Sequence, residues 1–192
     1  MGGTAYHFGF PPQACLVAVG LCSFAGMLPD IDSNTSKSFQ KCLYVAAGLG
    51  AILIFARLWH LGIGVDQAVF MGAFAFLVIR FGVGTFIKRY TTHRGMIHSI
   101  PAAVLCGQLL FFAISGTVEE RLVKSAALTI GFLSHLVLDE ICGISSRKKR
   151  PFGTALKWTD PKKKGLVTAL YVVIFCLGYA IFREYSSELA LK

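Results

Sequence analysis

Long apolar segments with few charges recur along this chain of 192 residues and constrain its fold more than any other feature. Each holds about 17 to 22 residues, and at a rise of about 1.5 Å per residue such a helix crosses a hydrocarbon core of roughly 30 Å. Hydrophobic residues make up 55% of the chain and charged residues only 15%, unlike an ordinary soluble domain. The six segments are 11–28, 42–58, 66–87, 98–117, 122–140 and 165–182.

The sequence therefore predicts an all-α fold, a polytopic integral membrane bundle of about six transmembrane helices, in a single membrane-embedded domain over residues 1–192. The first segment lacks a basic leading region and a cleavage site, so we expect it to stay as a membrane anchor. Arg80 lies within the third segment. We expect its side chain to snorkel toward the basic side, with contact to a substrate phosphate as the alternative.

Basic residues predict the orientation, because loops rich in Lys and Arg stay on the cytoplasmic side. The connections after the first, third and fifth segments hold thirteen of them: Lys37, Lys41, Lys88, Arg89, Arg94, Arg147, Lys148, Lys149, Arg150, Lys157, Lys162, Lys163 and Lys164. The opposite face holds five: Arg57, Arg121, Lys124, Arg183 and Lys192. Both termini are therefore predicted outside. The basic runs are expected to touch anionic lipid headgroups, and no nucleic-acid module accompanies them.

Six acids and imidazoles fall at the predicted cytoplasmic face, beside the ends of these segments. They are Asp30 and Asp32 in L-P-D-I-D, His93 and His98 in H-R-G-M-I-H-S, and His135 and Asp139 in S-H-L-V-L-D-E. His135 and Asp139 are four residues apart, so they share one face of a helix. We expect the three pairs to converge.

Imidazole and carboxylate ligands suit zinc, manganese or iron, and six of them are enough for one or two divalent ions with open water positions. Each residue taken alone has a plainer role. A single His such as His135 is more often a hydrogen-bonded packing residue, and a lone Asp30 more often caps a loop or a helix. The occurrence of all six on one face favours the metal site, because ionisable residues at membrane depth are costly and mark function.

These motifs resemble the YdjM-like family of inner-membrane proteins, whose members are described as LexA-regulated metal-dependent hydrolases. The resemblance covers most of the chain. It depends on L-P-D-I-D at 28–32, H-R-G-M-I-H-S at 93–99, G-F-L-S-H-L-V-L-D at 131–139 and P-F at 151–152. It implies an integral membrane hydrolase that needs a divalent metal. Family members typically also carry an early His, for which His7 is the candidate here, and it reaches the site only if Pro11 and Pro12 allow a re-entrant segment.

The expected chemistry is ester hydrolysis by a metal-activated water. Arg94 is expected to bind an anionic oxygen, with a lipid headgroup or a loop carbonyl as its plainer partner. Asp30 or Asp32 is the candidate base, whereas Glu140 is expected to face water. Ser99 and Ser134 are expected to be packing hydroxyls, because no third partner for a nucleophilic triad is evident.

A site at the membrane surface favours an amphiphilic substrate, and a phospholipid or polyprenyl-phosphate ester is the leading expectation. A soluble phosphoester or an amide is the alternative substrate. Two further functions stay open. A divalent-cation transporter would spread its ligands across the membrane depth, and a non-catalytic metal-binding protein would use the ion only to tie helices together.

Overall fold

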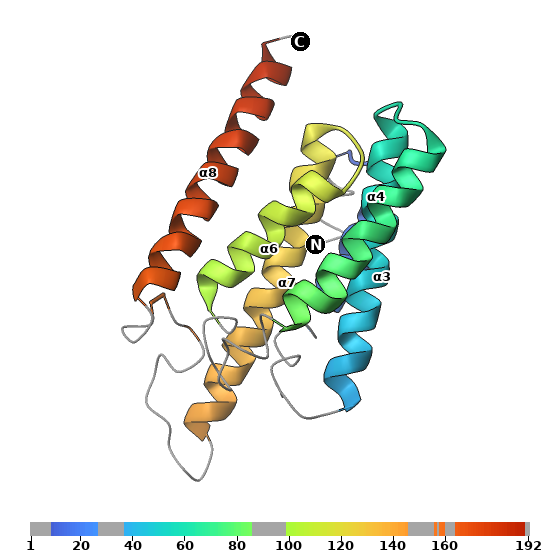
Figure 1. Ribbon diagram of the computed structural model, residues 1–192. Helices are drawn as coiled ribbons and strands as arrows, with labels where there is room; N and C mark the ends of the chain where they lie inside the picture. The colour runs from blue at the N-terminus through green and yellow to red at the C-terminus, as the bar shows by residue number, and fades with distance from the viewer. Residues whose placement is uncertain are drawn as a thin grey trace. The chain divides into compact units, whose positions relative to one another are not determined.

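The fold is entirely helical in the residues that the computed structural model describes, which are 9–26, 37–85, 99–145, 156, 158–159 and 164–190 (Figure 1). This confirms the all-α prediction. The helices, in chain order, are α2 (Pro12–Ala25), α3 (Lys37–His60), α4 (Val65–Leu77), its π-helical continuation η2 (Val78–Val83), α6 (Ile100–Ala113), α7 (Val118–Ser145) and α8 (Lys164–Leu189).

Each of the six predicted apolar segments corresponds to a helix, with α4 and η2 forming one continuous element. Among the described residues, four helices are long and apolar enough to cross a membrane, over Leu43–His60, Val65–Gly82, Val118–Cys142 and Lys164–Ala190. The other two, α2 and α6, have 14 residues each and span about 21 Å. They are thus shorter than the segments 11–28 and 98–117 expected from the sequence.

The described helices belong to two compact units, and each unit is considered by itself. One contains α2, most of α6, α7 and α8, and the other contains α3, α4 and η2. In the second unit, α3 and α4 form an antiparallel pair joined by a tight turn (Figure 1). Gly62 in that turn has a φ of +79°, a conformation that favours glycine. Gly72 lets the two backbones approach, since a Cβ there would lie 3.1 Å from the carbonyl oxygen of Ala51.

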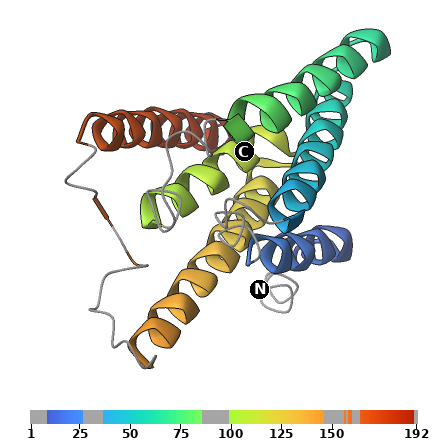
Figure 2. The ribbon, with the colours of Figure 1, turned by 60° about the horizontal axis from the view of Figure 1, so that its bottom comes forward.

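In the first unit, α2 packs closely against α7 (Figure 2). The closest approach is at Gly131, where a Cβ would lie 2.8 Å from the carbonyl carbon of Cys22. Gly26, which ends α2, is on the same side, because a Cβ there would lie 3.8 Å from the carbonyl oxygen of Gly131. Small residues at a crossing allow this contact in membrane helices. The crossing therefore fixes the end of α2 beside the middle of α7.

Polar contacts connect α6 and α8 to each other and to α7. Arg121 Nε on α7 donates to the carbonyl oxygen of Phe111 on α6 (3.0 Å), and its guanidinium carbon lies 3.9 Å from the centroid of the Phe111 ring. Gln108 Nε2 on α6 donates to the carbonyl oxygen of Ile174 on α8 (3.0 Å). Gly107 faces Thr129 and Ser125 of α7, with a Cβ position 3.2 Å from the carbonyl oxygen of Ser125. These contacts fix the relative heights of the three helices.

Candidate functional site

His135 and Asp139 lie one turn apart on the same face of α7, as their spacing predicts. Their Nε2 and Oδ2 atoms are 3.8 Å apart. The side chains are 15% and 30% exposed, and the Nε2 atom of His135 is itself buried. An imidazole nitrogen and a carboxylate oxygen at this separation supply two of the donor types that zinc and manganese accept.

The chain segment that carries Asp30 and Asp32 starts at the same level of α7. It leaves α2 at Gly26, four residues before Asp30. Gly26 lies against Gly131, and Gly131 is one turn before His135 on α7. Asp30 and Asp32 themselves lie outside the described residues. The close contact of α2 with α7 nevertheless brings the start of their segment to the turn that precedes His135.

The segment that carries His93, Arg94 and His98 ends at α6. Ser99 is fully buried and its Oγ accepts from the backbone N–H of Ala102 (3.3 Å), which caps the first turn of α6. Ser99 therefore has a structural role, as predicted. Ser134 does as well, since its Oγ donates to the carbonyl oxygen of Gly131 (2.8 Å).

The start of α6 also lies near the level of His135. Phe111 and Arg121 are at one height, because they are joined by a hydrogen bond. Since α6 and α7 run antiparallel (Figure 1), a step back along α6 is a step forward along α7. Ser99 is twelve residues before Phe111, and Leu133 is twelve residues after Arg121. The start of α6 is thus level with Leu133, about half a helical turn from the height of His135. His98 is the residue directly before this start.

The end of α2 and the start of α6 thus lie near one level of α7, and two of the predicted ligands, His135 and Asp139, are described. The remaining candidates fall outside the described residues and stay predictions: His7, Asp30, Asp32, His93, Arg94 and His98. Within the described ranges, no group of three or more His, Cys, Asp or Glu side chains is placed to hold a metal ion. The described pair therefore represents one third of the predicted six-ligand set.

Glu140 corrects one expectation. It was expected to face water, but it is only 2% exposed, and its Oε2 accepts from the backbone N–H of Leu156 (3.1 Å). Helical periodicity could not predict the burial of Glu140, because its hydrogen-bond partner Leu156 is sixteen positions later in the sequence. Glu140 attaches the connection after α7 to the turn that carries Asp139. On the α8 side of the same connection, Tyr171 donates to the carbonyl oxygen of Trp158 (2.8 Å).

A second polar cluster lies toward the opposite end of α7, where the basic-residue count placed Arg121 and Lys124. Arg121 is 2% exposed and binds the Glu184 carboxylate of α8 through both terminal nitrogens, with a distance of 3.3 Å from Nη2 to Oε2. Lys124 pairs with Glu120 at 3.1 Å. The spacing of Glu120 and Lys124, one turn apart, was a signal for the second pair. Arg121 and Glu184 are 63 residues apart in the sequence, so no local spacing predicts their pairing.

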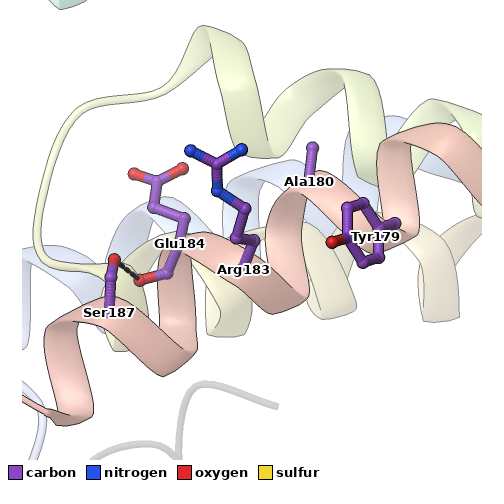
Figure 3. A pocket seen from close by; sticks show the side chains of 5 residues that line it. All are labelled: Tyr179, Ala180, Arg183, Glu184 and Ser187. Atoms are coloured by element: carbon purple, nitrogen blue, oxygen red, sulfur yellow. Dashed lines mark hydrogen bonds between the residues drawn. The ribbon is translucent and has the colours of Figure 1, made fainter.

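A hollow of about 380 Å³ lies on α8 beside this cluster, lined by Tyr179, Ala180, Arg183, Glu184 and Ser187. Figure 3 shows the Arg183 and Glu184 side chains rising from the same face of α8, with Ser187 donating to the backbone carbonyl of Glu184 (2.8 Å). Arg121, on the neighbouring helix, binds the Glu184 carboxylate that lines this hollow. The cluster therefore holds α8 to α7 at the end away from His135.

We expect Arg121→Met to lower the free energy of unfolding by about 2 kcal/mol, because it leaves the Glu184 carboxylate beside apolar surface without its partner. Arg183→Met, on the exposed face of α8, should change it by less than about 0.5 kcal/mol. Denaturant unfolding in mixed micelles measures both. The double variant Arg121→Met with Glu184→Leu should recover more than half of the loss. Equal effects of Arg121→Met and Arg183→Met would show that the pair stabilises nothing.

Arg80 is held in the other unit, at the end of the pair where α3 begins. Its Nη2 donates to Gln40 Oε1 (2.8 Å), and its guanidinium carbon lies 4.1 Å from the centroid of the Tyr44 ring. Gly84 of the same helix packs at Leu43, which places the backbone of Arg80 about one helical turn farther from this end. The side chain therefore extends toward the start of α3, in the direction expected of a snorkelling arginine.

The profile of the family described as YdjM inner membrane protein matches residues 2–191. No curated protein and no solved structure matches the chain.

Proposed function

Since this chain belongs to the YdjM inner membrane protein family, we propose that it is a metal-dependent hydrolase that cleaves a phosphoester of a lipid or another amphiphilic substrate. It is an inner membrane protein, with four helices of spanning length among its described residues. The observation that carries the proposal is the pair of His135 and Asp139 on one face of α7, at the level where α2 ends and α6 begins.

This level is where the proposal needs the ligands to meet. Gly26 at the end of α2 is four residues before Asp30, and His98 directly precedes Ser99 at the start of α6, so short stretches of chain connect these residues to the two helix ends. A catalytic metal site uses a mixed set of nitrogen and oxygen ligands and keeps a position open for substrate. The partial exposure of the Asp139 side chain supports such an open position, whereas the Nε2 atom of His135 is buried.

The proposed ligands are His93, His98, His135 and Asp139 with Asp30 and Asp32, joined by His7 if its segment is re-entrant, for one or two ions of zinc or manganese. A divalent metal supplies, when bound, a more acidic water and a polarised ester oxygen. A spare oxygen of Asp30 or Asp32 takes the proton of the attacking water. The planar fork of Arg94 binds a phosphate oxygen and orients the ester. The Glu140 carboxylate, attached to Leu156, keeps the last turns of α7 in place beside Asp139.

The proposed orientation places both termini outside and the site at the cytoplasmic face. The basic-loop count supports it, since thirteen basic residues follow the first, third and fifth apolar segments. A cytoplasmic site at the membrane surface fits a substrate whose head reaches the ligands while its tail stays in lipid.

Cation transport is the competing function, and it would need ligands along the membrane depth. Among the described ionisable residues at the far end of α7, four form two ion pairs between opposite charges, Arg121 with Glu184 and Lys124 with Glu120. Carboxylates already paired with Arg and Lys are poor ligands for a passing cation. The arrangement of charges along α7 therefore supports hydrolysis over transport.

The test is to purify the full chain in detergent, measure its metal content, and assay phosphate release from a panel of phospholipids and polyprenyl phosphates. We expect a divalent metal to be present and at least one lipid to be hydrolysed. Chelation should lower the rate by at least about 100-fold, and zinc or manganese should restore it. Protein that contains no metal and binds none on addition would overturn the proposal. Metal-dependent uptake into vesicles without hydrolysis would favour transport.

A further inference from the structure

We infer that Arg80 binds the phosphate of an amphiphilic ligand at the end of the α3 and α4 pair where α3 begins. The identification of that ligand with the substrate rests on the proposed function, whereas the binding itself does not. Arg80 is outside the six predicted metal ligands and is separated in sequence from Arg94, so it represents an additional recognition residue.

The first step is that the Arg80 guanidinium is held in a defined position. Gln40 accepts from Nη2 at 2.8 Å, and the rings of Tyr44 and Phe81 lie 4.1 and 5.3 Å from the guanidinium carbon. Arginine stacks on aromatic faces and keeps its in-plane N–H groups free for other partners. A positioned fork loses less conformational entropy on binding an anion than a free side chain does.

The second step is that, within the part of the chain that the structure describes, most of the Arg80 donors have no acceptor. Arg80 Nε is buried and has no acceptor among the residues the structure describes, and Nη1 makes no hydrogen bond within those same ranges. Arg121 provides the contrast in this chain, because Glu184 and the carbonyl oxygen of Phe111 occupy its donors. A buried N–H without an acceptor is unfavourable, so an anion that reaches this guanidinium gains from binding there.

The third step concerns the backbone. Arg80 is in the centre of the π-helical turn Val78–Val83 that ends the α4 helix. Such turns are rare, occur mostly as single turns inside α-helices, and are frequent at functional sites. The wider turn changes the direction of the side chains relative to a regular helix, and it does so at the only arginine of this helix.

The fourth step identifies the ligand as an amphiphile. Phe74, Leu77 and Phe81, on the turns around Arg80, are 53%, 51% and 59% exposed. A cationic fork beside an exposed apolar stripe fits a phosphate that carries a hydrocarbon tail. Free phosphate would use the fork but not the stripe.

The binding test uses metal-free full-length protein in detergent, with dioctanoyl phosphatidic acid as the probe and native mass spectrometry as the readout. We expect Arg80→Gln to weaken binding roughly ten-fold and Arg80→Lys roughly three-fold, because lysine keeps the charge but not the fork. Arg57→Gln, a matched loss of one arginine at the other end of the same helix pair, should change it by less than about two-fold. Inorganic phosphate and dioctanoylglycerol should each bind much more weakly than the complete probe.

A kinetic measurement separates substrate recognition from a purely structural role. In metal-loaded protein, a KM raised roughly ten-fold by Arg80→Gln, with kcat within about two-fold, would identify the amphiphile that Arg80 binds as the substrate. Unchanged affinity and KM with a lower thermal unfolding temperature would overturn the inference. Equal losses in Arg80→Gln and Arg57→Gln, or equal binding of inorganic phosphate, would also overturn it. Arg80-dependent binding without any hydrolysis by wild type would leave this site standing and refute only the proposed function.

Discussion

Replacing either described ligand should abolish both metal binding and hydrolysis. We expect His135→Ala and Asp139→Asn each to reduce bound metal to a small fraction of the wild-type content and to lower turnover by at least about 100-fold. The two side chains share one face of α7, with Nε2 and Oδ2 3.8 Å apart, so each removes a donor from the same place. Elemental analysis and lipid phosphate release, measured on the same samples, test this.

The chain contains matched controls for these two changes. His60 ends α3 and Asp66 is in the first turn of α4, so both lie at the end of their helices opposite to Arg80. We expect His60→Ala and Asp66→Asn to keep metal and activity within about two-fold of wild type, because neither belongs to the proposed ligand set. If His135→Ala retains its metal, or if His60→Ala loses as much, the site assignment is wrong.

Gly131→Ala should cause the largest loss of stability in the described helices. The added Cβ would lie 2.8 Å from the carbonyl carbon of Cys22, and backbone atoms cannot move away as a side chain can. We expect the free energy of unfolding to fall by about 3 kcal/mol, at the upper end of overpacking effects. Activity should fall as well, since the same contact fixes the end of α2 before Asp30, and small misplacements of catalytic groups are costly.

Gly20→Ala is the matched control on α2, because a Cβ at Gly20 meets nothing within 4 Å. Alanine favours a helix over glycine, so this variant should be equal to wild type or more stable by up to about 1 kcal/mol. The two Gly to Ala changes are thus expected to have opposite signs. Unfolding in mixed micelles, followed by circular dichroism, distinguishes them. A common sign would mean that the contact between α2 and α7 does not control stability.

The number and type of helices could be predicted from the sequence because burial in lipid leaves long uncharged runs. The helix ends could not be predicted in the same way. The predicted fifth segment began at residue 122, whereas α7 begins at Val118 and includes Arg121. A charge marks the end of a hydrophobic run only when it is exposed. Arg121 is instead neutralised by Glu184, from a helix that starts more than forty residues later.

The same distinction applies to the candidate site. The one-turn relation of His135 and Asp139 follows from their spacing and is confirmed. The burial of Glu140 depends on Leu156, and the height of α2 on α7 depends on the contact of Gly131 with Cys22. These are tertiary contacts between residues far apart in the chain, for which helical periodicity contains no information. The geometry within one helix was therefore predictable, whereas the residues from other parts of the chain that pack on each helix face were not.

The unequal lengths of the helices determine how a substrate can approach. The end of α2 and the start of α6 lie near the level of Gly131 and Leu133, whereas α7 continues to Ser145, twelve residues or about 18 Å farther. His135 is thus recessed from the tip of the longest helix. If this is the proposed site, a molecule that diffuses sideways within the leaflet would reach this depth without leaving the lipid, while a water-soluble phosphoester would have to descend from the surface. The route of access, in addition to contacts with the headgroup, would then select for substrates that carry a hydrocarbon chain.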